Sequence, residues 1–343
     1  MTGTGAAARV AMLLWSAISV GPLAAADTVT YRTGAERSSR VASATGTIVE
    51  YAGGRLTLRS DAGVPQIIPA ERIAEIQSDW TPAETTGDQL VREGSLAEAV
   101  QSYQQALRDE KRVWGQRQIV AKLIGCYGPL EQFDLAGEAF LRLLRSDSQT
   151  HYFRLIPLAW MPHSPTAGLQ QRAAAWLANT QDSVSLLLGA SWLLSVAPRA
   201  AAEQSLQRLL TDRDPRVAML AQAQLWRTRL ATATPDEIAG WEGWLMRLPG
   251  DLRAGPYYLI GQAWSAKGSA DKAALAFLRA PILYGTDRRL AAAALLSAGR
   301  ELERIGQVQE AATLYGEVVR DYAAAPAAIE ARGRLEEMTS SPP

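Results

Sequence analysis

The pattern of hydrophobic and polar residues changes once along the chain, close to residue 80. Before that point, residues 45–51 are rich in β-branched and aromatic side chains, and residues 55–59 alternate between polar and apolar. Alternation with a period of two is typical of a strand that buries one face. A Gly-Gly pair between the two segments predicts a hairpin turn, with Leu56 and Leu58 on the buried face.

Other short apolar runs extend this β segment. Val29 and Tyr31 predict a first strand, and residues 66–68 and 73–76 predict a second pair of strands on either side of a proline kink. Four or five short strands within residues 27–80 predict a small open barrel, which resembles SH3-like and Sm-like barrels. Some Sm-like barrels bind RNA, but this segment has six Arg against seven acidic residues. We therefore expect it to dock on its neighbour or to hold a partner.

After residue 80, Ala, Leu, Gln, Arg and Glu dominate, and one five-residue pattern occurs three times. Each copy has two glycines, an alanine, an aromatic residue and a small apolar residue, at intervals of 7, 5, 4 and 3. The three copies are Gly87, Gly94, Ala99, Tyr103 and Ala106; Gly261, Gly268, Ala273, Phe277 and Ala280; and Gly299, Gly306, Ala311, Tyr315 and Val318. A looser copy without the glycines consists of Tyr127, Ala136, Phe140 and Leu143.

This pattern predicts a pair of antiparallel helices in each copy. The second glycine suits a left-handed residue that ends the first helix, because glycine adopts that conformation without steric cost. The alanine, the aromatic residue and the small residue share one face of the second helix. The small residues let the two helices approach closely, and we expect the aromatic ring to pack on the first helix of the next unit. These positions resemble the tetratricopeptide repeat, which stacks helix pairs into a curved superhelix.

The middle of the chain is helical but follows a different register. Residues 201–210 and 218–226 resemble the two helices of a HEAT-type repeat, with Asp214 as the cap and Pro215 at the first position of the second helix. Residues 155–165, here called the strap, hold three prolines among apolar residues, which excludes a regular helix. The strap is either buried across the solenoid or part of a contact surface.

These observations predict a mostly α fold, an α-solenoid of tetratricopeptide-like and HEAT-like helix pairs preceded by a small β domain. The expected segments are a signal peptide over residues 1–26, a β domain over 27–80, a first repeat pair over 81–154, the strap over 155–165, a HEAT-like region over 166–250, C-terminal repeats over 251–338 and a tail over 339–343.

The first 26 residues have the pattern of an export signal. Arg9 is the only charged residue before Asp27, and residues 10–20 are mostly apolar, a run that is short for a membrane-spanning helix. A helix-breaking Gly-Pro pair follows, and Ala24 and Ala26 then place small residues before the cleavage point. We expect cleavage after Ala26 and a periplasmic or otherwise extracytoplasmic protein. The alternative is an uncleaved anchor, which would provide the protein's contact with the membrane.

Composition and motifs argue against several function classes. The 343-residue chain has 35 basic and 35 acidic residues, and this balance opposes nucleic-acid binding, which needs a basic face. Its single Cys excludes an internal disulfide framework and any multi-cysteine metal site. The sequence has no G-x-S-x-G, H-E-x-x-H or phosphate-loop motif. We therefore predict no enzyme activity, no cofactor and no metal.

Two residue pairs are weaker candidates for chemistry. His151 and His163 have no acidic neighbour in sequence except Asp147, so we interpret them as loop or helix-end residues in preference to a metal or acid–base pair. Trp241 and Trp244 lie three residues apart in an apolar stripe, which predicts core packing. A site that stacks a sugar or a peptide is the alternative for the two tryptophans.

The resemblance to tetratricopeptide repeats implies a scaffold or adaptor that binds a protein or peptide partner. In that family the first helix of each repeat lines a concave groove, and the matching positions here are Asp88, Arg92, Tyr258, Gln262, Arg300 and Arg304. We expect Arg300 and Arg304, four residues apart, to form a positive stripe that binds an acidic segment. With the export signal, the resemblance implies a non-enzymatic scaffold in the bacterial cell envelope. The alternative is a peptidoglycan-associated helical accessory to a glycan-processing enzyme, marked by a lone carboxylate in an aromatic-lined cleft.

Overall fold

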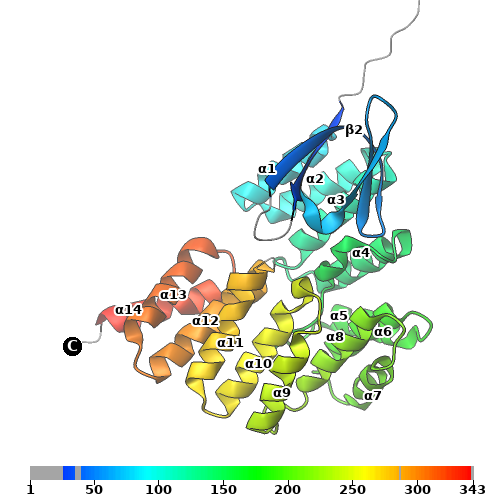
Figure 1. Ribbon diagram of the computed structural model, residues 1–343. Coiled ribbons are helices and arrows are strands. Elements are labelled where there is room, and N and C mark those ends of the chain that lie inside the picture. Colours follow the sequence, from blue (N-terminus) through cyan, green and yellow to red (C-terminus); the bar gives the residue numbers. More distant parts are fainter. Residues whose placement is uncertain (1–25, 35–39, 286, 341–343) are drawn as a thin grey trace, which may run out of the picture.

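The computed structural model describes residues 26–34, 40–285 and 287–340. Within these residues, a five-stranded antiparallel sheet precedes 14 α-helices, which confirms the predicted mostly α fold with a small β domain in front (Figure 1). The predicted signal peptide lies outside the described residues, apart from Ala26. Among the helices that the structure describes, none is both long enough and apolar enough to cross a membrane.

The strands pair in the order β4-β3-β2-β1-β5, and every pair is antiparallel. Their bounds are β1 (Asp27–Thr33), β2 (Arg40–Ala52), β3 (Arg55–Arg59), β4 (Pro65–Pro69) and β5 (Ile73–Gln77), with the short helix η2 (Ala70–Arg72) before β5. The β2–β3 hairpin is confirmed, and Leu56 and Leu58 are buried. The expected pairing of the last two strands is wrong. Because η2 carries the chain across the sheet, β4 pairs with β3 and β5 with β1, at opposite edges.

The helices follow one another as a solenoid, each packed against its neighbours in sequence. The first four, which form the first repeat pair, are α1 (Pro82–Glu93), α2 (Leu96–Asp109), α3 (Val113–Tyr127) and α4 (Phe133–Ser146). The middle helices are α5 (Ala167–Ala178), α6 (Ser183–Leu193), α7 (Ala200–Leu209), α8 (Pro215–Trp226) and α9 (Pro235–Leu245). The last are α10 (Ala254–Ala266), α11 (Ala270–Tyr284), α12 (Arg288–Arg304), α13 (Val308–Asp321) and α14 (Ala327–Ser340). Two short 3₁₀ helices, η3 (His151–Leu155) and η4 (Gly250–Leu252), lie between them.

The repeat glycines take the conformation that the spacing predicts. Gly94, Gly268 and Gly306 have φ angles of 82°, 75° and 79° and follow the first helix of their repeats. This left-handed conformation frees the chain to reverse direction within two or three residues, since glycine has no Cβ to clash. The predicted cap of α8 is also confirmed, because the Asp214 side chain accepts a hydrogen bond from the Arg216 N–H at 2.9 Å.

The other repeat glycine receives the aromatic ring of its own repeat. A Cβ atom placed on Gly299 would lie 2.3 Å from Cε1 of Tyr315, and the matching distance from Gly261 to Phe277 is 2.6 Å. The pattern did not predict this contact within one repeat, since we expected the ring to pack on the next unit. The ring therefore occupies the space that a side chain at the glycine would fill, and the glycine is also a small residue at the helix crossing.

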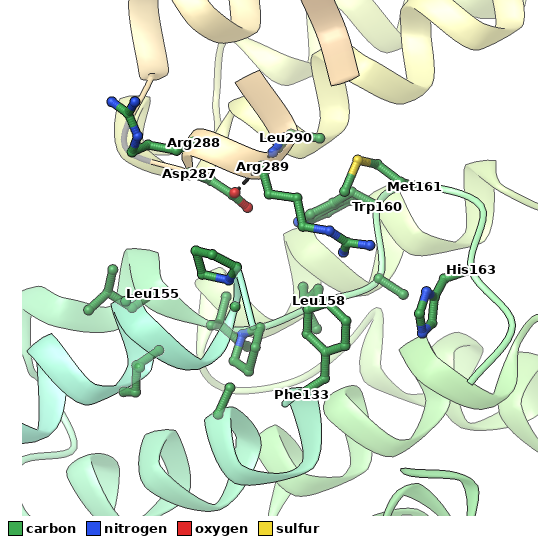
Figure 2. A pocket seen from close by; sticks show the side chains of 18 of the residues that line it. Phe133, Leu155, Leu158, Trp160, Met161, His163, Asp287, Arg288, Arg289 and Leu290 are labelled. Atoms are coloured by element: carbon green, nitrogen blue, oxygen red, sulfur yellow. Dashed lines mark hydrogen bonds between the residues drawn. The ribbon is translucent and has the colours of Figure 1, made fainter. Parts of the chain in front are cut away.

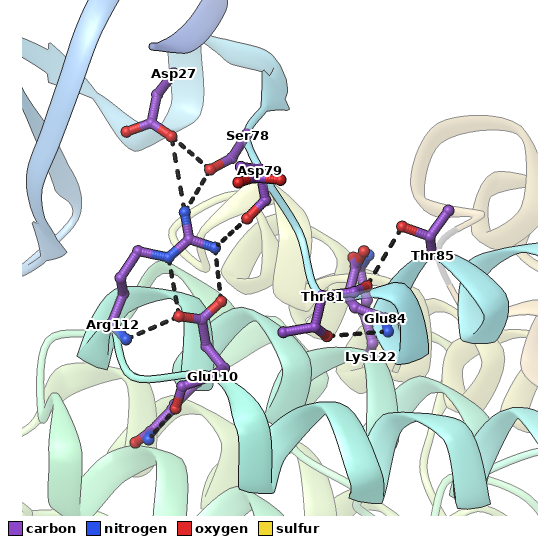
Figure 3. A network of polar contacts seen from close by, with 10 residues as sticks. Asp27, Ser78, Asp79, Thr81, Glu84, Thr85, Glu110, Arg112 and Lys122 are labelled. Carbon is purple, nitrogen blue, oxygen red and sulfur yellow. Dashed lines mark hydrogen bonds and ion pairs between the residues drawn. The ribbon is translucent and has the colours of Figure 1, made fainter. Parts of the chain in front are cut away.

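The sheet docks on the first helices through two arginines. Arg112, just before α3, bonds with its Nε and Nη2 atoms to the Glu110 carboxylate at 2.9 and 2.6 Å and with Nη1 to the Ser78 hydroxyl at 2.6 Å (Figure 3). Its Nη1 also lies 3.8 Å from the carboxylate of Asp27 on β1. Arg117 on α3 donates to the Glu50 carboxylate at 2.7 Å and to the backbone carbonyl of Tyr51. The expectation that the β domain docks on its neighbour is confirmed.

Candidate functional site

A cleft of about 830 Å³ opens where the curved solenoid brings its last repeats next to its first. One wall comes from α1, the start of α2 and the second half of α3. The other wall comes from the first residues of α12, the end of α13 and the loop before α14. Its charged lining residues are Asp88, Arg92, Glu93, Lys122, Arg288, Arg289, Arg320 and Asp321. The volume falls within the range of about 300–1,000 Å³ that is usual for binding sites.

A smaller apolar pocket of about 190 Å³ adjoins the cleft and shares Arg288 and Arg289 with it. Phe133 and the strap residues Leu158, Trp160 and Met161 line it, together with Trp192 (Figure 2). Arg289 reaches across the pocket toward Phe133, whereas Arg288 points away from it (Figure 2). The two hollows therefore form one site, with an apolar pocket beside a charged cleft.

Backbone and side-chain contacts hold the strap in place. The Ala159 N–H donates to the Ser191 hydroxyl at 2.9 Å, and the indole N–H of Trp192 donates to the Pro157 carbonyl at 2.9 Å. Ile156 and Leu158 are buried in the main core. Part of the strap, including residues 156, 158 and 159, is thus buried across the solenoid, as one of the two alternatives has it. Residues 155–161 and His163 of the strap also line the pocket, so the contact-surface alternative stays a proposal for the side of the strap that faces the pocket.

Most cations of the cleft are already paired with carboxylates of the chain. Lys122 binds Glu84 and, at 2.7 Å, Asp88, which also accepts a hydrogen bond from the Tyr103 hydroxyl. Burial is the main cause that raises the pKa of Glu84 above its usual value. Arg289 pairs with Glu131 at 2.8 Å. The Lys122 pairs join α3 to α1 within one wall, whereas the Arg289–Glu131 pair joins α12 to the loop after α3, and all of them leave little free charge at these positions.

Two arginines of the cleft form no ion pair among the described residues, although the charge of Arg288 acts on the neighbouring Asp321 carboxylate. Arg92 is exposed at the end of α1, and none of its atoms makes an ion pair there. Arg288 donates to the backbone carbonyl of Asp321, and its guanidinium carbon lies 4.9 Å from the ring centre of Tyr322. A guanidinium whose donors face solvent is suited to bind a carboxylate of another molecule.

The structure separates the six positions predicted to line a groove. Asp88 and Arg92 line the cleft, but Asp88 is occupied by Lys122. Gln262 lies at another pocket, on the far side of the strap. The prediction for Tyr258 is wrong: its side chain is 6% exposed and its ring packs 5.3 Å from that of Phe277. At this position of α10, the ring packs into the core instead of facing solvent.

The predicted positive stripe on α12 is also wrong. The Nε atom of Arg300 donates to Glu330 of α14 at 2.8 Å, and Arg304 pairs with Glu301 at 2.7 Å. Each arginine is neutralised by a carboxylate of the chain itself, so the two do not form an unpaired stripe. Glu330 lies 30 residues away from Arg300 in sequence, which the local pattern on α12 did not reveal.

Arg288 and Arg289, which start α12, are lining residues that the sequence pattern did not predict. The available signal was the run Asp287-Arg288-Arg289, in which Asp287 caps the helix by accepting from the Leu290 N–H at 3.0 Å. The cap is followed by two adjacent cations at the start of the helix, of which Arg288 is exposed and Arg289 is half-buried. Their meeting with the first repeat pair could not be derived from the run alone.

The histidines and tryptophans that we weighed for chemistry pack against other rings. His151 stacks on Tyr51 with ring centres 4.2 Å apart, and burial lowers its pKa to about 3. His163 lies against Phe133 and Trp192. Trp241 stacks on Trp226 at 4.9 Å and is 9% exposed, which supports the core interpretation. No group of three or more metal-binding side chains occurs in the part of the chain that the structure describes.

Comparison with known proteins adds no family to this picture. No family model matches the chain, and no curated protein matches it either. The assignment of a function therefore depends on the site itself.

Proposed function

We propose that this protein is a non-enzymatic repeat scaffold that binds an extended segment of another protein in the cleft between its first and last repeats. Stacked helix pairs form curved superhelices whose inner surfaces suit extended partners. The chemistry of the lining supports the proposal, because an apolar pocket adjoins cations that lack partners in the chain. The resemblance of the repeats to tetratricopeptide repeats supports it independently.

The observation that carries this proposal is the pairing state of the cleft's cations. Lys122, Arg289 and Arg320 form ion pairs with carboxylates of the chain, while Arg92 and Arg288 form none among the described residues. An acidic segment would supply the missing carboxylates. One bulky apolar side chain of that segment would enter the pocket between Phe133 and Trp160. Its removal from water would contribute about 1.5–3 kcal/mol to the free energy of binding.

We further propose that the scaffold works outside the cytoplasm, in a bacterial cell envelope. The apolar run after Arg9 and the small residues before Asp27 support export. With a cleaved signal, the exported chain would begin at Asp27, whose carboxylate accepts from the Ile48 N–H at 2.7 Å and anchors β1.

The alternative is that the protein is an accessory to a glycan-processing enzyme. A lone carboxylate in an aromatic-lined cleft would favour this alternative. Asp287 is such a carboxylate, since it lines the pocket beside Trp160 and Trp192. Its carboxylate is used to cap α12, however, and glycoside hydrolysis usually needs two carboxylates about 5–9.5 Å apart. No other carboxylate is found in the lining of this pocket as the structure describes it. We therefore favour a protein partner.

The test selects peptides on the purified protein from a phage-displayed random library and measures their affinity by fluorescence polarisation. We expect the selected peptides to combine acidic residues with a bulky apolar one. The double variant Arg92→Glu/Arg288→Glu should bind them about tenfold or more weakly, a loss of about 1.4 kcal/mol. Binding to the wild type should also weaken as salt is raised.

The matched control is Arg142→Glu/Arg145→Glu, which makes the same change of charge on α4 at exposed positions outside the cleft lining. This control should bind like the wild type. Equal loss in both variants would mean that only net charge matters. Selected peptides without acidic residues, or sedimentation of the protein with isolated peptidoglycan in place of peptide binding, would count against the proposal.

A further inference from the structure

A second pocket, of about 240 Å³, lies on the other side of the strap. It is partly open and is lined by strap residues 160–162, the segment after α6, the segment after α8 and Gln262 on α10. Trp160 and Met161 line both this pocket and the one that adjoins the cleft, so the strap separates the two. Arg227 and Thr228 contribute polar side-chain groups to the lining of this second pocket.

Arg227 bonds only to neutral groups of the protein. Its Nη1 donates to the Ser191 carbonyl at 2.7 Å and to the Gln224 side-chain oxygen at 2.8 Å. Its Nη2 donates to the Ser195 hydroxyl at 2.7 Å. These bonds fix the guanidinium plane, and no carboxylate forms an ion pair with Arg227 among the described residues.

Three of the five N–H donors of this guanidinium are therefore used. The Nε–H and one hydrogen on Nη2 remain without a protein acceptor among the residues described. Burial lowers the pKa of Arg227 to about 10, so the side chain still carries its charge at neutral pH. A partly buried cation without a counter-charge is costly unless another molecule supplies one.

Apolar and polar side chains share the remaining walls of the pocket. Trp160, Met161 and Leu194 lie on one part of the lining, and Leu230 adds to it. Arg199 brings a second guanidinium, which also pairs with Glu203 at 2.7 Å. Two free N–H donors suit the two oxygens of a carboxylate, and the apolar walls suit a hydrocarbon group attached to it.

We propose that this pocket binds a carboxylate attached to an apolar group, held by Arg227 and covered by Trp160 and Met161. The proposal goes beyond the scaffold function, because it concerns the opposite side of the strap and none of the cleft's unpaired arginines. A small organic acid and the free C-terminus of a polypeptide share this chemistry.

The test titrates the purified protein with N-acetyl-L-leucine and with N-acetyl-L-leucinamide, which differ in the anionic group alone, and follows binding by ligand-observed NMR. We expect saturable binding of the acid at concentrations on the order of a millimolar, as its size allows, and at least about tenfold weaker binding of the amide. Equal binding of acid and amide would overturn the proposal without any variant being made. Tighter binding of inorganic phosphate than of the acid would overturn its apolar part.

Two variants locate the site. Arg227→Gln should abolish binding of the acid, whereas Arg229→Gln, two residues away at an exposed position paired with Glu237, should not change it. Because Arg227→Gln could disturb folding, Gln262→Trp provides a second variant that fills the pocket from α10 and should also block the acid. Unchanged binding in both pocket variants would place the acid elsewhere and refute the assignment. A pentapeptide that ends in leucine separates the two sources: tighter binding than the small acid supports a C-terminus, and equal binding supports a small acid.

Discussion

The contact between a repeat glycine and the ring of its own repeat can be tested with a single methyl group. In Gly299→Ala the new Cβ would lie 2.3 Å from Cε1 of Tyr315, far inside van der Waals contact. The ring cannot move aside easily, because Tyr315 is 0% exposed and its hydroxyl donates to Glu303. Either the ring or the α12–α13 crossing must shift.

The expected magnitude follows from two opposing terms. Alanine in place of glycine inside a helix stabilises by about 0.5–1 kcal/mol, while overpacking costs about 1–3 kcal/mol. Gly316→Ala is the matched control, since it lies in α13 of the same repeat and has nothing within 4 Å of its Cβ position. The two variants make the same chemical change, so their stabilities should differ by the overpacking cost alone, about 1–3 kcal/mol.

Urea denaturation followed by circular dichroism measures this difference, provided that the slope of the transition is the same in both variants. We expect Gly299→Ala to unfold at a lower urea concentration than the wild type and Gly316→Ala at a higher one. Gly299→Ala should cost less in a Tyr315→Leu background than in the wild type, since the ring that meets the methyl group is gone. If both single variants shifted the urea midpoint by the same amount, the interpretation that the Tyr315 ring needs a glycine at position 299 would be refuted.

Three further predictions concern other parts of the chain. The pKa of His151 is lowered to about 3 in the folded state, so unfolding takes up a proton below pH 6.5 and the free energy of unfolding falls as the pH drops. This residue lowers the free energy of unfolding at pH 5 by about 2 kcal/mol, and His151→Phe should remove that loss. Calorimetry of both proteins at pH 7 and pH 5 measures this, and an equal loss in both would contradict the assignment. Arg117→Met leaves the buried Tyr51 carbonyl without its donor, which should lower the free energy of unfolding by about 1–3 kcal/mol. Hydrogen exchange of the backbone amides in β2 should therefore become faster. Unchanged exchange would show that other contacts hold the sheet. Amino-terminal sequencing of the exported protein should begin at Asp27, and an intact Met1 on membrane-bound protein would reject cleavage after Ala26.

Local features of the fold could be predicted because they depend on neighbours in sequence. The glycine that ends each first helix is fixed by backbone conformation, as Gly94 and Gly306 show. The β2–β3 hairpin follows from a Gly-Gly turn between alternating segments. The edge positions of β4 and β5 were not predictable in this way, because the path of η2 decides them.

The site depends on contacts between distant parts of the chain, and for that reason most of it escaped prediction. Arg289 and Glu131 are 158 residues apart, yet their ion pair joins the two walls of the cleft. The repeat register identified Arg92 as a lining residue but could not show that Arg300 is neutralised by Glu330. Charge compensation is a property of the packed solenoid, so it can be judged only once the helices are placed.

Hydrogen–deuterium exchange of the whole protein, with and without a selected peptide, tests whether a partner segment lies in the cleft and fills the pocket beside it. We expect slower exchange in the backbone of the strap, at the start of α12 and in residues 320–326, the segments that line the two hollows. The Arg92→Glu/Arg288→Glu variant at the same peptide concentration should lose this protection. Protection confined to the sheet, or to α10 and α12 around Gln262 and Arg304, would contradict the claim and place the partner elsewhere.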